Sequence, residues 1–222
     1  MKTIMSVCAV LVMAAYCAGP ASAQTAAANE ASVPEGKIFN SRGTVECLRA
    51  GRTVWVEAVP PFVLRQGDNV RTGRRSMAEI YTRYGAKVRL GSRTTFALHK
   101  ISREKNSVEV LAGHLEAWIK KNVGRRFEVR TPSAVCAVRG TTFAVLVGRG
   151  GRTVWDLFKG SLEVSGADNR PVVLSDNQRL TVTKDEGAQQ VTVIPAGVRP
   201  PAEPKKTAEE RLEDRAYAKE AR

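Results

Sequence analysis

The chain has 222 residues with 43% hydrophobic and 26% charged side chains, and its formal net charge is +13 at pH 7. This length suffices for one domain with a substantial core, or for one domain with tails. The positive charge suits an anionic membrane, an acidic polymer or an acidic protein. We expect no nucleic-acid partner, because the basic residues are scattered through predicted strands and turns rather than interleaved with stacking aromatic residues.

The N-terminus has the pattern of an export signal. Lys2 precedes an apolar run over 4–18, and Ala21-Ser22-Ala23 matches the small-x-small cleavage pattern. We therefore expect a signal peptide over 1–23, a mature start at Gln24 and a periplasmic or secreted protein. No second long apolar run follows, so we expect no integral membrane segment after cleavage.

Lipoprotein processing at Cys17 is the alternative to this cleavage. It is disfavoured because Tyr16 is bulky where a lipoprotein signal requires a small residue. A retained N-terminal anchor is disfavoured further, because the apolar run is short for a membrane span.

A β-strand pattern follows an alanine-rich segment over 24–36, which we expect to be a flexible lead-in. From 37 to 194 apolar and polar residues alternate, and turn signals recur every eight to twelve residues. No amphipathic helix of normal length interrupts them. The pattern predicts an all-β fold, either a single sandwich or a rolled β domain of many short strands. The expected strands cover 43–48, 53–57, 78–82, 86–90, 95–98, 107–111, 114–119, 126–130, 134–138, 142–147, 152–157, 161–164, 172–174, 178–182 and 190–194.

Part of this block repeats. The pentapeptide over 51–55 recurs identically over 151–155, and the downstream stretches 62–68 and 172–178 are loosely parallel. Together these matches suggest two related β-modules stacked side by side. Short units that begin at Gly43, Gly113 and Gly160 also recur, and each predicts a turn into a new strand.

The composition changes after the β block. Four prolines between 195 and 206 predict a stiff linker. The final segment, 207–222, is rich in Glu, Arg, Lys and Ala and begins with a capping-box pattern. We expect this short C-terminal tail to be a solvated helix or disordered, with docking to a partner as the functional alternative.

Two cysteines remain after the signal peptide, Cys47 and Cys136. In an oxidising compartment they could form a disulfide, which would stabilise the fold by roughly 4 kcal/mol in the chain-entropy model. The alternative is two separate buried thiols that act as small apolar core residues. The chain has no CxxC pair or Cys/His cluster of the kind that binds structural zinc, and we expect neither a metal nor a cofactor.

The sequence lacks a recognisable catalytic set, so we expect a protein that is not an enzyme. His99 and His114 are its only histidines, and neither is accompanied by a nucleophile motif. Trp55, Trp118 and Trp155 could form a sugar-stacking platform, but each lies in an apolar alternation that favours core packing.

The stretch from Arg139 to Phe143 predicts a tight turn. We expect Gly140 to provide the unusual backbone angle, Thr141 to form a local hydrogen bond and Phe143 to enter the core. Arg139 could pair with an acidic residue or bind an anion.

Several of these motifs, in order, resemble the FecR domain family. The resemblance covers about 43–182 and includes Gly67-Asp68, the Gly113 turn, Thr131-Pro132 and Arg139-Gly-Thr-Thr-Phe143. Thr-Pro followed by Arg-Gly-Thr-x-Phe is its most specific part. The resemblance implies an exported, β-rich domain. The best-known members are inner-membrane regulators that relay a signal from an outer-membrane transducer to a cytoplasmic sigma factor.

This chain has an export signal where those regulators carry a cytoplasmic segment, so we expect a stand-alone exported protein rather than an anti-sigma regulator. The sequence therefore predicts a non-enzymatic binding or sensing module of the cell envelope, whose partner is an envelope protein or an anionic envelope polymer. Peptidoglycan or glycan binding is the alternative function.

Overall fold

The computed structural model describes residues 35–82, 85–101, 105–120, 126–188 and 190–205, together with Arg211 and Arg215. All of them belong to one unit, Ser32–Arg222. The expected signal peptide, residues 24–34 of the expected lead-in, and the expected tail apart from these two arginines lie outside the described residues.

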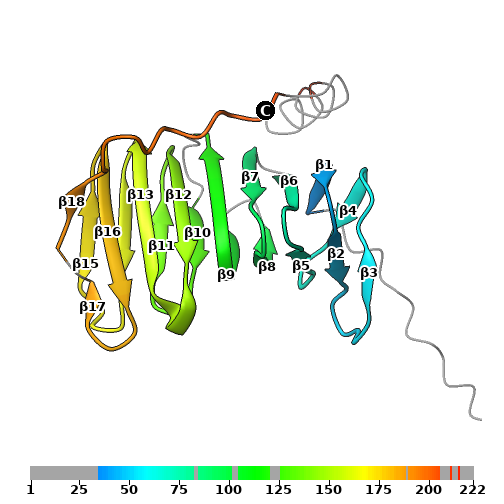
Figure 1. Cartoon of the computed structure of the whole chain (residues 1–222), viewed down its shortest axis with the longest axis horizontal. Helices are drawn as coiled ribbons and strands as arrows, with labels where there is room; N and C mark the ends of the chain where they lie inside the picture. Colours follow the sequence, from blue (N-terminus) through cyan, green and yellow to red (C-terminus); the bar gives the residue numbers. More distant parts are fainter. Residues whose placement is uncertain are drawn as a thin grey trace, which may run out of the picture. The chain divides into compact units, whose positions relative to one another are not determined.

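The described residues fold into β-strands joined by short turns (Figure 1), and this confirms the expected all-β class. One helical turn, η1 (Arg149–Gly151), interrupts them. The strands are β1 (Gly36–Arg42), β2 (Val45–Leu48), β3 (Trp55–Glu57), β4 (Phe62–Leu64), β5 (Asn69–Thr72), β6 (Met77–Thr82), β7 (Ala86–Leu90), β8 (Thr95–Ile101), β9 (Lys105–Ile119), β10 (Arg126–Arg130), β11 (Val135–Val138), β12 (Thr142–Val147), β13 (Thr153–Lys159), β14 (Leu162–Ser165), β15 (Pro171–Leu174), β16 (Gln178–Thr183), β17 (Gly187–Ala188) and β18 (Thr192–Val193).

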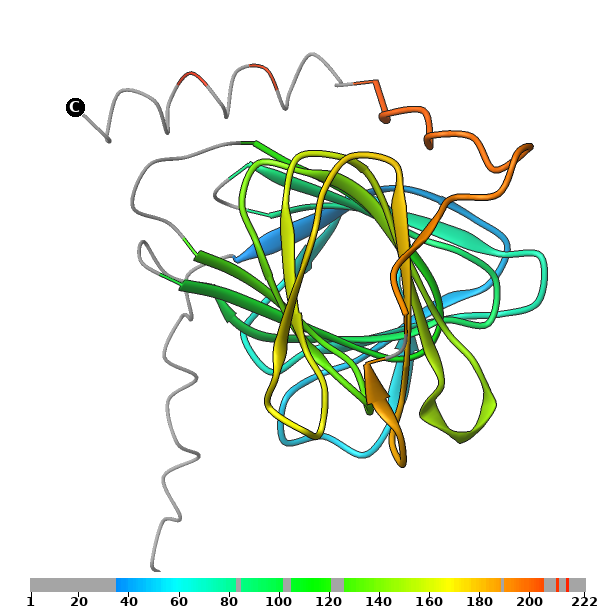
Figure 2. The ribbon, with the colours of Figure 1, turned by 90° about the vertical axis from the view of Figure 1, so that its left-hand side faces the viewer.

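These strands form two layers that share β9. Sheet A has the order β4-β1-β6-β7-β9-β12-β13-β16, and both β17 and β18 pair with β16. Sheet B has the order β3-β2-β5-β8-β9-β10-β11-β14-β15. The chain passes repeatedly between the two layers, and the view along the strand stack shows the resulting roll (Figure 2). The β9–β10 pair is parallel.

The long strand β9 joins the two layers through a kink at Gly113. Its first half pairs with β8 and β10 in sheet B, and its second half pairs with β7 and β12 in sheet A. Gly113 has φ +96°, and a Cβ atom there would lie 2.5 Å from Cα of Thr94. Only glycine fits such a position without strain. The prediction that Gly113 forms a turn between two strands is wrong, because residues 105–119 form one continuous strand that bends at this glycine.

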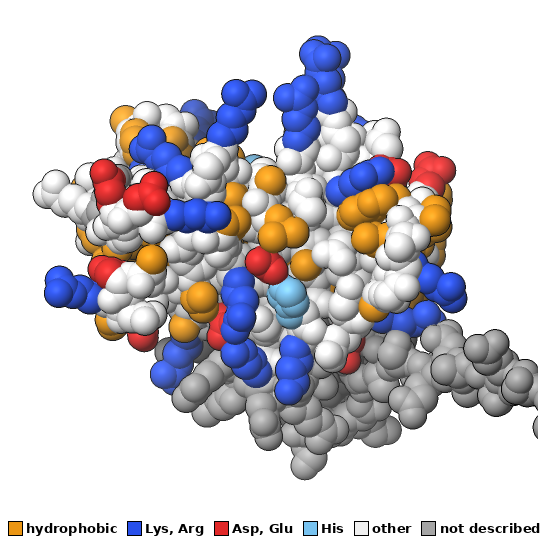
Figure 3. Space-filling view, turned by 90° about the horizontal axis from the view of Figure 1, so that it is seen from below, with side chains coloured by type: hydrophobic (Ala, Val, Ile, Leu, Met, Phe, Trp, Pro, Cys, Tyr) orange, Lys and Arg blue, Asp and Glu red, His pale blue; other side chains and the backbone are white. Residues whose placement is uncertain are grey.

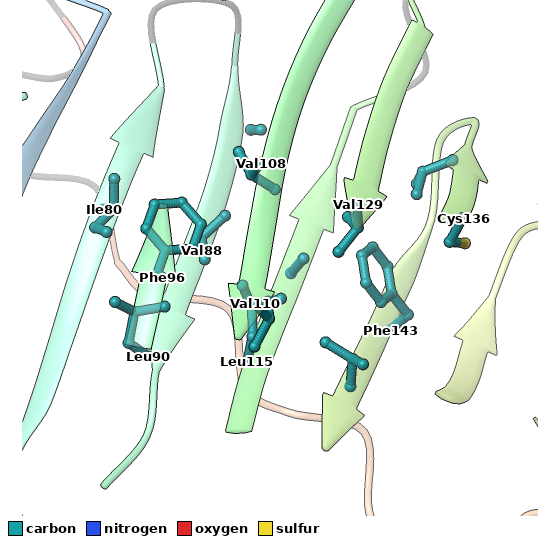
Figure 4. Packing of buried hydrophobic residues seen from close by; sticks show 14 of the residues in the cluster. Ile80, Val88, Leu90, Phe96, Val108, Val110, Leu115, Val129, Cys136 and Phe143 are labelled. Carbon is teal, nitrogen blue, oxygen red and sulfur yellow. The ribbon is translucent and has the colours of Figure 1, made fainter. Parts of the chain in front are cut away.

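The core lies between the layers and follows the period-two alternation of side chains. Sheet A contributes residues such as Val88, Leu115 and Phe143, and sheet B contributes Phe96 and Val129, all of them buried. Figure 4 shows side chains from both layers packing together. Each large apolar side chain that is fully buried stabilises the fold by about 1.5–3 kcal/mol.

The repeated pentapeptide does not occupy equivalent places. Gly51–Trp55 leads into β3 in sheet B, where Trp55 is half-buried on the outer face. Gly151–Trp155 leads into β13 in sheet A, where Trp155 is fully buried in the core. The identical sequences therefore reflect a shared turn-to-strand chemistry and give no support to two equivalent modules.

Candidate functional site

Gly67 and Asp68 lie in the turn between β4 and β5, at one end of the roll. Hydrogen bonds join Asp68 to the turn between β2 and β3. The buried Asp68 carboxylate accepts hydrogen bonds from Arg49 Nη1 at 2.6 Å and from the backbone N–H of Arg65 at 2.9 Å. Ala50 N–H donates to its other oxygen at 3.2 Å. With these hydrogen bonds, the Asp68 carboxylate stabilises the turn between β4 and β5.

Thr131 and Pro132 belong to a corner closed by buried hydroxyl groups. Thr131 Oγ1 accepts a hydrogen bond from Ala134 N–H at 3.1 Å. It accepts a second one from Thr153 Oγ1 at 3.2 Å. Ser133 Oγ donates to Thr153 Oγ1 at 2.8 Å. Pro132 lies close to Gly151 of the neighbouring turn. The Thr131-Pro132 part of the family motif therefore forms a structural corner.

The turn from Arg139 to Phe143 connects β11 to β12. Phe143 is fully buried and lies 6.2 Å from Trp155 between ring centroids, as expected for a core residue. Arg139 is exposed and makes no ion pair within the described part of the chain.

The prediction that the Thr141 side chain forms a local hydrogen bond is wrong. The buried Oγ1 atom of Thr141 lacks a partner among the described residues, and the methyl group of this side chain packs against Gly160. The backbone carbonyl of Thr141 instead accepts a hydrogen bond from Ile119 N–H at 2.9 Å. Gly140 contacts the same Gly160 through its carbonyl oxygen.

Cys47 and Cys136 are both free and buried, so the disulfide considered from the sequence does not form. Four strands of sheet B separate β2 from β11, a distance of roughly 24 Å at the usual strand spacing. Disulfides require Cα atoms within about 7 Å. Burial raises the pKa of the Cys47 thiol to about 12, and the nearby Asp68 charge adds to this effect while Arg49 opposes it. Burial also raises the pKa of Cys136.

The three tryptophans do not form one platform. Trp55 lies on the outer face of sheet B, where the Arg71 guanidinium stacks 4.2 Å from its ring centroid. Trp155 is in the core. Trp118 lies on the outer face of sheet A, where it contacts the proline-rich segment at Pro201. A sugar-stacking surface built from all three is excluded by this placement.

An exposed sheet edge lies at the β3 end of the roll. Within the described residues β3 pairs only with β2, and its other side carries no strand. Val54 is 70% exposed and Val56 is 43% exposed, and Val59 is also exposed. Arg71 hydrogen-bonds to Glu46 at 2.7 Å beside Trp55, and this bond lowers the pKa of the Glu46 carboxyl. Sequence reasoning treated this strand as ordinary, because exposure at an edge depends on strand order.

A row of charged side chains crosses the outer face of sheet A. Arg89 on β7 lies opposite Glu79 on β6 and Glu116 on β9, and it hydrogen-bonds to both at 2.9 Å. Farther along, Arg179 binds both oxygens of Asp156. The ion pairs with Glu79 and Glu116 hold the Arg89 guanidinium in one place.

The proline-rich segment expected to be a linker lies against sheet A. Figure 1 shows it (orange to red) running from the β16 end of the sheet along the upper ends of the neighbouring strands. Lys87 Nζ donates to the Pro204 carbonyl at 2.8 Å, and Trp118 Nε1 donates to the Pro201 carbonyl at 3.3 Å. The sequence carried no signal for these contacts, because they use backbone carbonyls of the segment.

The basic residues do not form a continuous stripe on the face seen from below (Figure 3), where hydrophobic and acidic side chains separate them. Within the ranges that the structure describes, no three His, Cys, Asp or Glu side chains gather as metal ligands. Helices that are long and apolar enough to cross a membrane are also absent from the described residues.

Comparisons with known proteins identify the class of domain. Residues 68–163 match the model of the family described as FecR protein, so this part of the chain is a FecR domain. The resemblance noted in the sequence is thereby confirmed. No curated protein matches the chain.

Two crystal structures of a proposed anti-sigma factor from Parabacteroides distasonis ATCC 8503, at 1.65 Å and 2.50 Å resolution, are similar to the chain. Each has 18% sequence identity and a TM-score of 0.49. The alignment spans 56% of this chain and 57% of that protein.

Proposed function

We propose that this chain is a non-enzymatic, exported binding module of the bacterial cell envelope, which contacts a partner protein through the free edge of β3. The observation that carries this proposal is the unpaired side of β3, with an exposed valine on the strand, Val56, and another directly before it, Val54. An unpaired edge offers backbone N–H and C=O groups on which a partner strand can add. The FecR domain match supports a role in binding or signal relay.

The placement of the reactive side chains supports a role other than catalysis. Both thiols are buried and kept protonated by their raised pKa values, whereas a nucleophilic cysteine needs an accessible thiolate. His99 is engaged with Glu109 on the outer face of sheet B, at 2.5 Å.

The edge is tested by photo-crosslinking in envelope extracts. A photoreactive phenylalanine analogue replaces Val56 in one variant and Leu146 in the other. Leu146 is a matched control, because it is 49% exposed but lies on β12 in the middle of sheet A. We expect a discrete crosslinked protein at position 56 and none at position 146.

A charge at the edge provides the second arm of this test. Val56→Lys is expected to abolish the crosslink from a probe placed at Val54, because an edge lysine opposes strand addition. Leu146→Lys should leave that crosslink unchanged. Equal labelling from positions 56 and 146, or a crosslink that persists in Val56→Lys, counts against strand addition. Retention on purified cell wall, with no protein crosslink, would favour the glycan alternative.

Export is part of the proposal and has its own test. It rests on the apolar run and the Ala21-Ser22-Ala23 pattern near the N-terminus. N-terminal sequencing of protein recovered from the periplasm or medium should begin at Gln24. Recovery of uncleaved protein in the cytoplasm would contradict it.

A further inference from the structure

We propose that the outer face of sheet A around Lys87, Arg89 and Trp118 is a docking site for extended, proline-rich peptides that carry a carboxylate. Residues 201–204 of this chain occupy the site as a displaceable ligand in cis. The inference is independent of the proposed function, because it uses the outer face of sheet A and not the β3 edge.

The site contacts the segment through its backbone carbonyls. Trp118 Nε1, Arg89 Nη2 and Lys87 Nζ donate hydrogen bonds at 3.3, 3.1 and 2.8 Å to three carbonyls within four residues. The acceptors are the carbonyls of Pro201, Ala202 and Pro204. Proline has no N–H group, so an extended proline-rich chain presents carbonyl oxygens as its polar groups. Donors beside an aromatic ring are the usual way in which proteins bind such chains.

Lys87 adds a preference for a negative charge. Its side chain is 4% exposed, and Nζ lies 2.9 Å from Glu203 Oε1. Both partners found for this ammonium group, the Glu203 carboxylate and the Pro204 carbonyl, belong to the docked segment. A buried charge is stable only when it is paired, so a ligand without a carboxylate at this position would bind less well.

Arg89 is held ready for the ligand by the sheet itself. Its guanidinium bonds to Glu79 and Glu116, which are its direct cross-strand neighbours, and it lies 5.2 Å from the Trp118 ring centroid. The donor that reaches Ala202 is therefore oriented before the peptide arrives. A rigid donor loses little conformational entropy on binding, and this favours affinity.

The covalent connection of residues 201–204 to β18 explains how so small a contact stays formed. A short tether from β18 gives the segment an effective concentration on the order of millimolar, so weak intrinsic binding suffices. A partner peptide of the same chemistry and higher affinity would displace it. Residues 195–205 would then act as a built-in competitor that sets the threshold for binding.

The experiment uses the full chain with a protease site inserted at Gly197, where a Cβ atom would meet nothing within 4 Å. The three tryptophans are labelled with 5-fluorotryptophan, and Trp118→Phe identifies the Trp118 signal by ¹⁹F NMR. After cleavage and removal of the released segment, the Trp118 signal should move while those of Trp55 and Trp155 remain unchanged. A synthetic peptide of residues 198–205 should restore the signal with saturable binding.

Two changes test the chemistry of recognition. The peptide with Glu203→Lys should bind at least about tenfold more weakly, because it replaces attraction to Lys87 by repulsion. In the Lys87→Met chain, the preference between the two peptides should disappear. If the cleaved segment remains bound and cannot be exchanged, it is a permanent part of the fold and the proposal is overturned. Failure of millimolar peptide to restore the Trp118 signal overturns it equally.

Discussion

Gly113 on β9 and Thr94, before β8, approach so closely that a Cβ atom on Gly113 would lie 2.5 Å from both Cα and Oγ1 of Thr94. The Thr94 hydroxyl also accepts a hydrogen bond from His114 N–H at 3.0 Å, directly after the kink. This contact fixes the point at which β9 passes from sheet B to sheet A. The passage in turn sets how the two layers face each other across the core.

Gly113→Ala is therefore expected to lower the free energy of unfolding by about 3 kcal/mol or more, since it combines an unfavourable backbone angle with a clash. Gly51→Ala is the matched control, because Gly51 has φ +70° but a Cβ atom there would meet nothing within 4 Å. The control should lose only about 1 kcal/mol. Urea unfolding measures both, and equal losses would show that the clash is relieved at no cost.

Removal of the Asp68 carboxylate should loosen the β3 end of the roll. Asp68→Ala leaves Arg49 and two backbone N–H groups without their acceptor, so we expect a loss of about 2–3 kcal/mol in the free energy of unfolding. Asp185→Ala, in an exposed turn, should change it by less than about 0.5 kcal/mol. Thermal unfolding with both variants decides the matter, and a neutral Asp68→Ala would contradict a structural role for this carboxylate.

The hydroxyl corner can be tested by an isosteric change. Thr153→Val removes the Oγ1 atom that lies between Ser133 and Thr131, so buried polar groups lose a partner while the volume stays constant. We expect a loss of about 1–3 kcal/mol in the free energy of unfolding. Thr181→Val on the partly exposed surface of β16 should be nearly neutral. The same loss in both variants would mean that the valine side chain, and not the missing hydroxyl, is responsible.

The buried thiols should make the fold sensitive to alkali. The pKa of Cys47 is raised from 9.0 to about 12 in the folded protein, and that of Cys136 is also raised. As the pH rises, the unfolded chain releases these thiol protons at a lower pH than the folded protein does. The stabilisation from the protonated thiols is therefore complete below pH 9 and is lost as pH rises through the folded pKa values. The loss should approach about 1.4 kcal/mol per pH unit for each thiol above pH 9.

A Cys47→Ala, Cys136→Ala chain provides the comparison, because its other titrating groups are the same. Urea unfolding between pH 8 and pH 10.5 should show a steeper decline for the wild-type chain. Thiol titration adds a direct test: both thiols should react in unreduced protein only after unfolding. Parallel pH curves, or rapid reaction in the native state, would contradict burial of the thiols.

Many strands were predictable from the local alternation of apolar and polar residues along the chain. The alternation over 142–147 places Phe143 in the core, and the expected strand matches β12. Strands β1, β4, β5 and the two-residue β17 were not predicted. A β-bulge between Ile38 and Asn40 interrupts the pattern in β1, and β4 and β5 have only three and four residues.

The sequence by itself determined the all-β class, the unusual backbone angle at Gly113 and the family resemblance, because each depends on neighbouring residues or on short-range backbone preferences. Only the tertiary structure decided that four strands separate Cys47 from Cys136, that Trp55 faces outward while Trp155 is buried, and that residues 201–204 contact the outer face of sheet A. Those facts depend on strand order and on backbone carbonyls. Strand order joins residues far apart in the chain, and every residue has a carbonyl, so neither leaves a signature in residue type.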